Sequence, residues 1–290
     1  MNKDSNDNAL FITEKCNNNC LMCCQPPKKV DDIKLHYHRN LNIIESAPDD
    51  LTEIGITGGE PTMAGEYLLK LIDAVRDKWP NAILHILTNG RSFADESFLD
   101  KLLSHTGEKV YMGIPLHSDY GKDHDMIAGA KGSFVETMRG LYNLAERNVE
   151  IELRIVLNKL NTMRLPQMAE FIFKNLTFVG WVAFMGMERC GLAIKNHDKI
   201  WIEPISYIRP LEKAMLTLSS RGIDSVIYNI PLCLLPKSLH AFAAKSISDW
   251  KVRYLSQCDS CDAKESCCGT FSTSSMPYDG ISALNEYFSS

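Results

Sequence analysis

Apolar runs alternate with amphipathic stretches along the chain at a spacing that few folds accommodate. Six runs read as strands, and the intervals between them hold a helix and its return crossover. The predicted strands lie at 9–15, 52–57, 82–90, 109–118, 149–157 and 177–187. Helices are predicted from about residue 36 and at 65–79, 94–104, 133–147 and 165–175, with a loop at 119–132. The helix at 65–79 is predicted from the apolar face made by Leu68, Leu69, Leu71, Ile72 and Val75. Strands joined by helical crossovers run parallel, which indicates an α/β fold.

Six repeats are fewer than the eight that close a barrel, so the α/β fold expected is a partial (β/α)6 barrel. Functional groups are then expected at the carboxyl ends of its strands. Beyond the sixth strand we expect the alternation of strands and helices to stop. A helix at 206–220, a strand near 226–228 and a helix at 237–247 are expected next, followed by a cysteine-rich tail. We predict a barrel domain at 1–202 and a C-terminal segment at 203–290 that packs against it, because that segment alone makes a marginal core.

Composition excludes several classes of protein. With 31 Lys+Arg against 36 Asp+Glu and a net charge of −5, the chain has no global basic field to hold a phosphate backbone, so no nucleic acid is expected as a partner. No run of 18 uncharged apolar residues is present, and the first residues, MNKDSNDN, are polar. We therefore expect no membrane span and no signal peptide, and a cytoplasmic protein.

The distribution of the ten cysteines indicates metal sites. In a reducing compartment, cysteines at tight spacings act as metal ligands or catalytic thiols more often than as disulfides. Four lie within 16–24 and four within 258–268, with only Cys190 and Cys233 between the two groups. The sequence therefore predicts two separate metal sites.

The first group has the spacing Cys16-x3-Cys20-x2-Cys23, which offers three thiolates from one loop. On a four-iron cluster, three protein ligands leave one iron open, and an open position is where a substrate or cofactor binds. A structural zinc is the alternative, with Cys24 or His36 as its fourth ligand.

Together with Gly58-Gly59-Glu60-Pro61 at the end of the second predicted strand, this loop resembles the radical S-adenosylmethionine (radical SAM) superfamily. The resemblance implies a [4Fe–4S] cluster on the three cysteines, with its open iron chelated by the amino and carboxylate groups of SAM. It further implies that an electron from the cluster splits SAM into methionine and a 5′-deoxyadenosyl radical that removes a hydrogen from the substrate.

The same resemblance implies positions that contact SAM. Gly58, Gly59, Glu60 and Pro61 would receive the methionine ammonium, since glycines permit close backbone approach and positive φ. Met22 would contact adenine through its side chain, and the region of Met185 would contact adenine through backbone groups. Ser118 would contact the ribose, and Arg154 the SAM carboxylate. Alternatives remain, because Gly-Gly-Glu-Pro is also an ordinary turn, Arg154 also suits a structural ion pair, and methionines also suit a core.

The tail carries Cys258-x2-Cys261-x5-Cys267, and Cys233 lies upstream. These four thiolates suffice for a second [4Fe–4S] cluster, and their spacing resembles the auxiliary-cluster segments of radical SAM peptide maturases. Zinc on the same four thiolates is the structural alternative. The gap of five residues favours Cys267 over Cys268. Cys24 and Cys190 are predicted to be small buried apolar residues.

Further phrases narrow the resemblance to the radical SAM maturase of His-Xaa-Ser systems. They are Gln25-Pro26-Pro27 after Cys23 and the stretches at 114–119, 130–134, 246–251 and 267–271. This resemblance implies a precursor peptide as substrate and an electron donor such as flavodoxin or ferredoxin. We expect no N-terminal leader-binding domain, so a separate recognition protein or second maturase is a further expected partner. The alternatives are a radical SAM enzyme acting on a small molecule or nucleobase, and a non-catalytic binding module stapled by metal.

Overall fold

The computed structural model describes residues 1–2 and 8–285, and the chain forms two compact units. The units interleave along the sequence. The first contains Met1–Asn19, Gln25–Pro115 and Ala128–Glu152, and the second contains Cys20–Cys24, Leu116–Ile127 and Leu153–Ser290. The polar N-terminal stretch used above lies in part at residues 3–7, outside the described residues. Within the described part of the chain, no helix combines the length and apolar composition that a membrane crossing requires.

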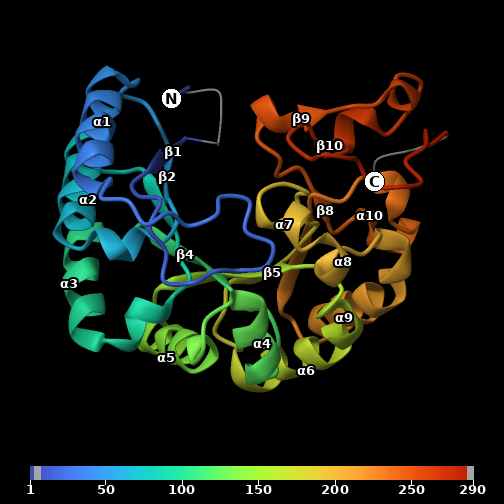
Figure 1. The fold of residues 1–290 in the computed structure, drawn as a ribbon, viewed down its shortest axis with the longest axis horizontal. Helices are drawn as coiled ribbons and strands as arrows, with labels where there is room; N and C mark the ends of the chain where they lie inside the picture. Colours follow the sequence, from blue (N-terminus) through green and yellow to red (C-terminus); the bar gives the residue numbers. More distant parts are fainter. Residues whose placement is uncertain (3–7, 286–290) are drawn as a thin grey trace. The chain divides into compact units, whose positions relative to one another are not determined.

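The first unit repeats a strand and a helix (Figure 1). Its elements in chain order are β1 (Ala9–Phe11), α1 (Ile33–Ser46), β2 (Glu53–Thr57), α2 (Glu66–Lys78), β3 (Ile83–Leu87), α3 (Glu96–Thr106), β4 (Val110–Pro115) and α5 (Ser133–Glu146). β1 pairs with β2, β2 with β3, and β3 with β4, and every pair is parallel. The helical crossovers predicted between parallel strands are therefore present in this unit.

Buried apolar residues come from the strands and from one face of each helix. The side chains of Leu10, Ile54, Ile56, Leu84 and Ile86 are fully buried in the strands of this unit. Helix α2 buries the five residues on which its prediction depended, Leu68, Leu69, Leu71, Ile72 and Val75. Helix α3 begins where the Asp95 carboxylate accepts hydrogen bonds from the amides of Ser97 and Phe98.

The second unit continues the alternation. Its elements are α4 (Gly121–Ala128, of which Ala128 belongs to the first unit), the end of β5 (Glu150–Val156), α6 (Leu165–Asn175), β6 (Trp181–Met185), α7 (Leu192–Lys195), α8 (His197–Ile200), α9 (Ile208–Ser220), β7 (Asp224–Tyr228), α10 (Lys237–His240) and β8 (Ala243–Ala244). β6 pairs in parallel with β7, and β7 with β8. A two-residue antiparallel pair, β9 (Val252–Arg253) and β10 (Thr270–Phe271), brackets the cysteines of the tail.

Short 3-10 helices connect these elements: η1 (Pro61–Ala64), η2 (Arg91–Ala94), η3 (Thr162–Arg164), η4 (Pro204–Ser206), η5 (Leu232–Leu234), η6 (Asp249–Lys251), η7 (Ser256–Cys258) and η8 (Lys264–Ser266). Two of them, η1 and η2, follow strands β2 and β3 directly. They turn the chain at the strand ends where functional groups are expected.

Three local predictions are wrong. The loop expected at 119–132 contains α4, whose many polar residues concealed a face made by the buried His124, Ile127 and Ala128. The alternation does not stop after the sixth strand, because α9 carries the chain to β7 beside β6. The helix expected at 237–247 ends at His240, since Ala243 and Ala244 pair with β7 and this pairing overrides their helix propensity. The domain boundary placed at residue 202 stays a prediction.

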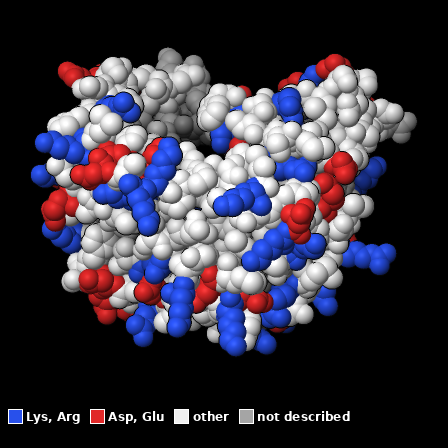
Figure 2. All heavy atoms as spheres, viewed as in Figure 1, with Lys and Arg blue, Asp and Glu red and all other residues white. Residues whose placement is uncertain are grey.

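Charged side chains of both signs are interspersed on the face drawn in Figure 2. Neither Lys and Arg nor Asp and Glu cover that face alone. Such a surface holds a phosphate backbone poorly, in agreement with the overall acidic balance.

Candidate functional site

The loop after β1 presents Cys16 half-buried in the first unit. Burial raises the pKa of the Cys16 thiol, and the amide of Asn18, which donates to its Sγ at 3.3 Å, acts in the opposite direction. A coordinated cation removes the proton of a thiol outright. A half-buried thiol that already accepts an amide hydrogen bond therefore fits the role of a metal ligand.

Residues that follow β3 hold the asparagines next to Cys16. Asn89 Nδ2 donates to Asn17 Oδ1 at 2.6 Å. Arg91 Nη1 donates to the Asn17 carbonyl at 2.6 Å and to Asn18 Oδ1 at 2.8 Å, while its Nε is paired with Glu136 at 2.6 Å. The sequence analysis missed this support, for which the polar run Asn89-Gly90-Arg91 after the third predicted strand was the only signal.

Gly58 and Gly59 lie against the backbone that leads to Cys16. A Cβ on Gly58 would lie 2.7 Å from the Thr13 carbonyl oxygen, and one on Gly59 would lie 2.3 Å from that of Lys15. The close approach expected of these glycines is present, but neither has the positive φ that was also expected. Their requirement for glycine comes from contact with this chain's own main chain.

The Glu60 carboxylate is fully buried and faces inward. Its Oε1 accepts from Thr62 N at 3.1 Å, Thr62 Oγ1 at 2.7 Å and Thr88 Oγ1 at 2.6 Å, and its Oε2 accepts from Asn89 N at 2.7 Å. As N-cap of η1, with Pro61 as the first helical residue, it satisfies donors that the helix leaves open. Glu60 thus ties the end of β2 to the end of β3.

Replacing Gly59 by alanine is expected to destabilise the protein by about 1–3 kcal/mol, because neither the new Cβ nor the Lys15 backbone has room to move. The absorbance of a reconstituted iron–sulfur cluster should fall together with the stability, because Lys15 directly precedes Cys16, a proposed cluster ligand. Urea unfolding followed by circular dichroism measures the first effect. The matched control is Gly55→Ala, whose Cβ would meet the methyl group of Ala9 at 3.2 Å. Equal losses in both variants would show that the approach to Lys15 is not the reason for glycine.

The second half of the cysteine loop belongs to the second unit. Cys23 N donates to the Cys20 carbonyl at 3.1 Å, and Leu21 N donates to Ile127 O at 2.9 Å. Leu192 N donates to the Cys23 carbonyl at 2.9 Å. The backbone around Cys20 and Cys23 is therefore held by α4 and by the loop that opens α7.

His117, directly after β4, lies beside Cys20. Its Nε2 is 3.8 Å from Cys20 Sγ, and Asn161 Nδ2 donates to its carbonyl at 3.1 Å. Burial, with a smaller contribution from His124, lowers the pKa of His117 to about 3. The imidazole is therefore neutral at physiological pH, and in its Nε2-protonated tautomer it donates toward the Cys20 sulfur.

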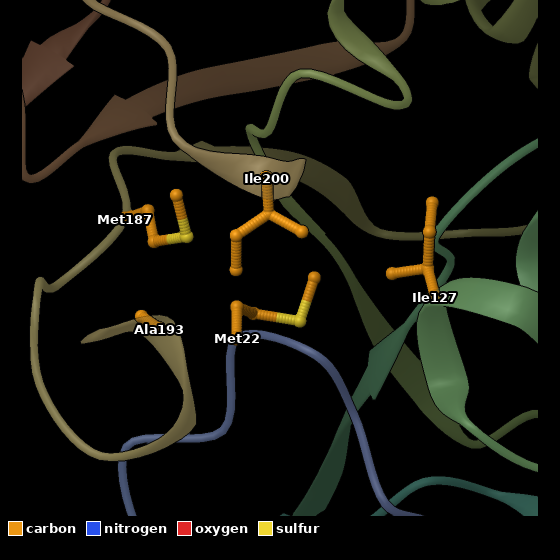
Figure 3. Packing of buried hydrophobic residues seen from close by; sticks show 5 residues of the cluster. All are labelled: Met22, Ile127, Met187, Ala193 and Ile200. Carbon is orange, nitrogen blue, oxygen red and sulfur yellow. The ribbon is translucent and has the colours of Figure 1, made fainter. Parts of the chain in front are cut away.

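Met22 is buried, with 7% of its surface exposed, in an apolar cluster with Ile127, Met187, Ala193 and Ile200. Figure 3 shows its side chain directed toward Ile200. Burial here makes Met22 a packing residue that fixes the loop between Cys20 and Cys23. Its contact with adenine stays a prediction.

The other positions expected to touch SAM belong to the second unit and lie after β4, within β5 and at the end of β6. Ser118 is fully buried, and its Oγ accepts from Tyr120 N at 3.2 Å in the turn that opens α4. The carbonyl of Arg154 in β5 accepts from Leu116 N, and that of Met185 in β6 accepts from Leu157 N, each at 2.9 Å. Their roles toward SAM stay predictions.

His36, the alternative zinc ligand, is engaged within the first unit. Its ring packs edge-on against Phe11, with 5.2 Å between ring centroids, and its Nε2 is 3.5 Å from Asp32 Oδ2. Asp32 in turn accepts from Thr13 Oγ1 at 2.7 Å. This arrangement serves the packing of α1 on β1.

In the tail, the structure brings the four predicted cysteines together. A small cavity of about 20 Å³ is lined by four cysteines, Cys233, Cys258, Cys261 and Cys267. Its other walls include Leu232, Tyr254, Ala263, Ile281 and Leu284. The four cysteines come from two stretches of sequence, η5 and the turns between β9 and β10. Four thiols around one largely apolar cavity match the donor set of an iron–sulfur cluster or of a structural zinc.

Backbone amides point at two of these sulfurs. Leu284 N donates to Cys261 Sγ at 3.3 Å, and Leu232 N and Gly269 N donate to Cys267 Sγ at 3.4 and 3.5 Å. The thiol of Cys268, followed by the amides of Gly269 and Leu232, lowers the pKa of Cys267 to about 6. Cys267 is thus prepared to be the thiolate of the adjacent pair, while Cys268 supports it.

The tail is fastened to the end of β6 beyond its cysteines. Tyr278 OH donates to the Met187 carbonyl at 3.0 Å, and its ring stacks on Trp201 with 5.3 Å between centroids. Ser275 N donates to the Arg189 carbonyl at 2.9 Å. Before the cysteines, Tyr254 OH donates to the Cys267 carbonyl at 2.9 Å.

Cys24 and Cys190 contradict the expectation that they are buried apolar residues. Cys24 is exposed and Cys190 is half-buried. Both lie in loops, where no core surrounds them, and both adjoin the carboxylate of Glu188. Cys24 lies far from Glu188 and Cys190 in the sequence, so no pattern in the sequence indicates that they are in contact.

Comparisons with known proteins assign the fold. Residues 10–172, more than half of the chain, match the family model of the radical SAM superfamily. Fe-coproporphyrin III synthase of Methanosarcina barkeri is 30% identical over 166 residues, covering 56% of this chain and 39% of the relative. The sporulation killing factor maturation protein SkfB of Bacillus subtilis is 26% identical over 165 residues, covering 56% and 38%.

Among solved structures, SuiB of Streptococcus suis bound to S-adenosylmethionine aligns with a TM-score of 0.61 and 14% identity, covering 84% of this chain and 53% of that one. The chain spans less than three fifths of the length of each of these relatives. The α/β fold and the cysteine-rich C-terminal segment expected from the sequence are confirmed. By the match over 10–172 and by this fold, the chain belongs to the radical SAM superfamily.

Proposed function

We propose that this chain is a radical SAM enzyme that cleaves SAM reductively and modifies a ribosomally synthesised peptide of the His-Xaa-Ser type. The observation that carries the peptide assignment is the cavity lined by Cys233, Cys258, Cys261 and Cys267. An auxiliary cluster there is the feature by which the tail resembles peptide maturases. Similarity to SkfB, itself a maturation protein, supports the same assignment.

Cys16, Cys20 and Cys23 would hold the SAM-binding [4Fe–4S] cluster, and the four tail cysteines a second one. When bound, the first cluster supplies the electron that splits SAM into methionine and a 5′-deoxyadenosyl radical. The neutral His117 imidazole next to Cys20 would stabilise thiolate charge without adding a positive charge.

The chain's own residues would orient SAM through backbone atoms. The amides of Gly59 and Glu60 donate to Thr13 and Lys15, each at 2.7 Å. The carbonyl oxygens of Gly58 and Gly59 are then the groups suited to accept from the methionine ammonium. Glu60 acts as a positioning residue, because its carboxylate is occupied by Thr62, Thr88 and Asn89. Ser118 and Arg154 are proposed partners of the ribose and the carboxylate.

A second candidate is a radical SAM enzyme acting on a small molecule. It is favoured by the 30% identity to Fe-coproporphyrin III synthase, whose name gives a tetrapyrrole product. In either case the reaction needs an electron donor of the flavodoxin or ferredoxin class, and the peptide route is proposed to use a separate recognition protein or a second maturase.

Co-expression with a peptide carrying His-Xaa-Ser repeats tests the proposal. We expect mass spectrometry to find a changed peptide mass only when the protein is present, and the purified anaerobic protein to release 5′-deoxyadenosine from SAM under reduction. An unchanged peptide, together with SAM-dependent conversion of a coproporphyrin, would select the small-molecule function instead.

A further inference from the structure

Cys24, Glu188 and Cys190 form a third group of metal-ligating side chains, separate from the two cysteine sets above. One ligand atom from each, two sulfurs and a carboxylate oxygen, lies within 4.8 Å of the others. All three residues belong to the second unit. Ligand atoms of a tetrahedral zinc site lie about this close, since zinc binds sulfur at about 2.3 Å and oxygen at about 2.0–2.2 Å.

Backbone contacts hold the two loops that carry these ligands in a fixed relation. Leu192 N donates to the Cys23 carbonyl at 2.9 Å. A Cβ on Gly191 would lie 2.5 Å from that same carbonyl oxygen and 2.7 Å from the Cys24 carbonyl, and its φ of +53° suits glycine. Cys190 N donates to the Glu188 carbonyl at 3.0 Å, a turn that brings residues 188 and 190 together. The group is therefore built into the backbone.

The Glu188 carboxylate is oriented by residues behind it. Lys251 Nζ is 3.2 Å from Oε2, and Thr273 Oγ1 donates to Oε1. The Glu188 side chain is 11% exposed. Zinc ligands in proteins are commonly held in this way by outer hydrogen-bonding partners. A divalent cation bound there would replace the protons of the two thiols and add positive charge beside the Glu188 carboxylate, which Lys251 already contacts.

We propose that Cys24, Glu188 and Cys190 bind one Zn²⁺ ion, with solvent in the fourth position. Two thiolates favour zinc over magnesium or calcium, which prefer oxygen ligands. Cys24 is exposed, so solvent reaches the group and can supply the fourth ligand. Three protein ligands and one exchangeable position are the arrangement of zinc sites that accept an external ligand.

The test uses the anaerobically reconstituted iron–sulfur protein, incubated with one equivalent of ZnCl2 and passed over a desalting column. We expect about one zinc per chain in the wild type and almost none in Cys190→Ala, with unchanged iron, because two ligands hold zinc far more weakly than three. Cys24→Ser, at an exposed position, should give the same loss. The matched control is Cys268→Ala, a cysteine outside this group, which should keep its zinc.

X-ray absorption at the zinc edge should show two sulfur neighbours at about 2.3 Å and oxygen in the remaining positions. Four sulfurs, or zinc retained in both Cys190→Ala and Cys24→Ser, would place the ion in the tail and overturn the proposal. So would a wild type without zinc whose alkylated peptide map shows Cys24 and Cys190 joined as a disulfide.

Discussion

Replacing Cys16, Cys20 and Cys23 together by alanine is expected to halve the iron of the reconstituted protein, from about eight to about four per chain, and to abolish release of 5′-deoxyadenosine. These thiolates are the only protein ligands proposed for the SAM-binding cluster, so their loss leaves that cluster without attachment. Iron and zinc content by elemental analysis, with chromatography of the nucleoside, measures both effects. A protein whose tail holds zinc would instead fall from about four irons to none and keep one zinc.

The control for this experiment is Cys24→Ser, in the same loop. Cys24 is exposed and is not one of the three proposed ligands of the first cluster. Its iron content should equal that of the wild type. An iron content that the triple substitution does not change would sink the assignment of the first cluster.

Removal of Cys258 and Cys261 is expected to separate the two halves of the reaction. The double alanine variant should still release 5′-deoxyadenosine from SAM, while the modified peptide disappears. The reason is that both cysteines line the tail cavity, whereas the residues proposed to bind SAM lie in the loop after β1, within β5 and at or after the ends of β2, β4 and β6. Nucleoside release and peptide mass are measured in the same reaction mixture.

Metal–thiolate bonds also stabilise a small segment, so folding must be checked first. Near-UV circular dichroism reports it, because Trp201 stacks on Tyr278 of the tail. Ser266→Ala is the matched control, since Ser266 is exposed in the same stretch of chain and does not line the cavity. A folded double variant that modifies the peptide at the wild-type rate would show that the tail metal is a structural staple.

The sequence predicted best what depends on neighbouring residues. Helix α6 begins and ends where its apolar period indicated, at Leu165 and Asn175, and the buried face of α2 is the predicted one. The prediction from sequence failed where a partner distant in the chain decides the secondary structure. Ala243 and Ala244 have helical propensity and form a strand because β7 offers a pairing edge.

The same distinction holds for the candidate sites: features set by neighbouring residues were predicted, and contacts between distant residues were not. Spacing of two to five residues sufficed to select Cys258, Cys261 and Cys267, three of the four cysteines that line one cavity. The requirement for glycine at position 59 depends on Lys15, and the partners of Cys24 lie beyond residue 187. No periodicity within one stretch encodes such contacts, because they are fixed only when the strands and loops have assembled.

The fastening of the tail by Tyr254 and Tyr278 has a consequence for the entropy of metal insertion. Closing a flexible loop costs a free energy that grows with the logarithm of its length. Here the hydrogen bonds from both tyrosines, and the bond from Ser275, already restrain the chain on either side of the cysteines. An incoming metal therefore finds Cys258, Cys261 and Cys267 in short turns that are restrained on both sides, and its binding energy is not consumed in ordering the whole segment. The tail should release and regain its metal while Tyr278 and Ser275 stay bonded to the residues that follow β6.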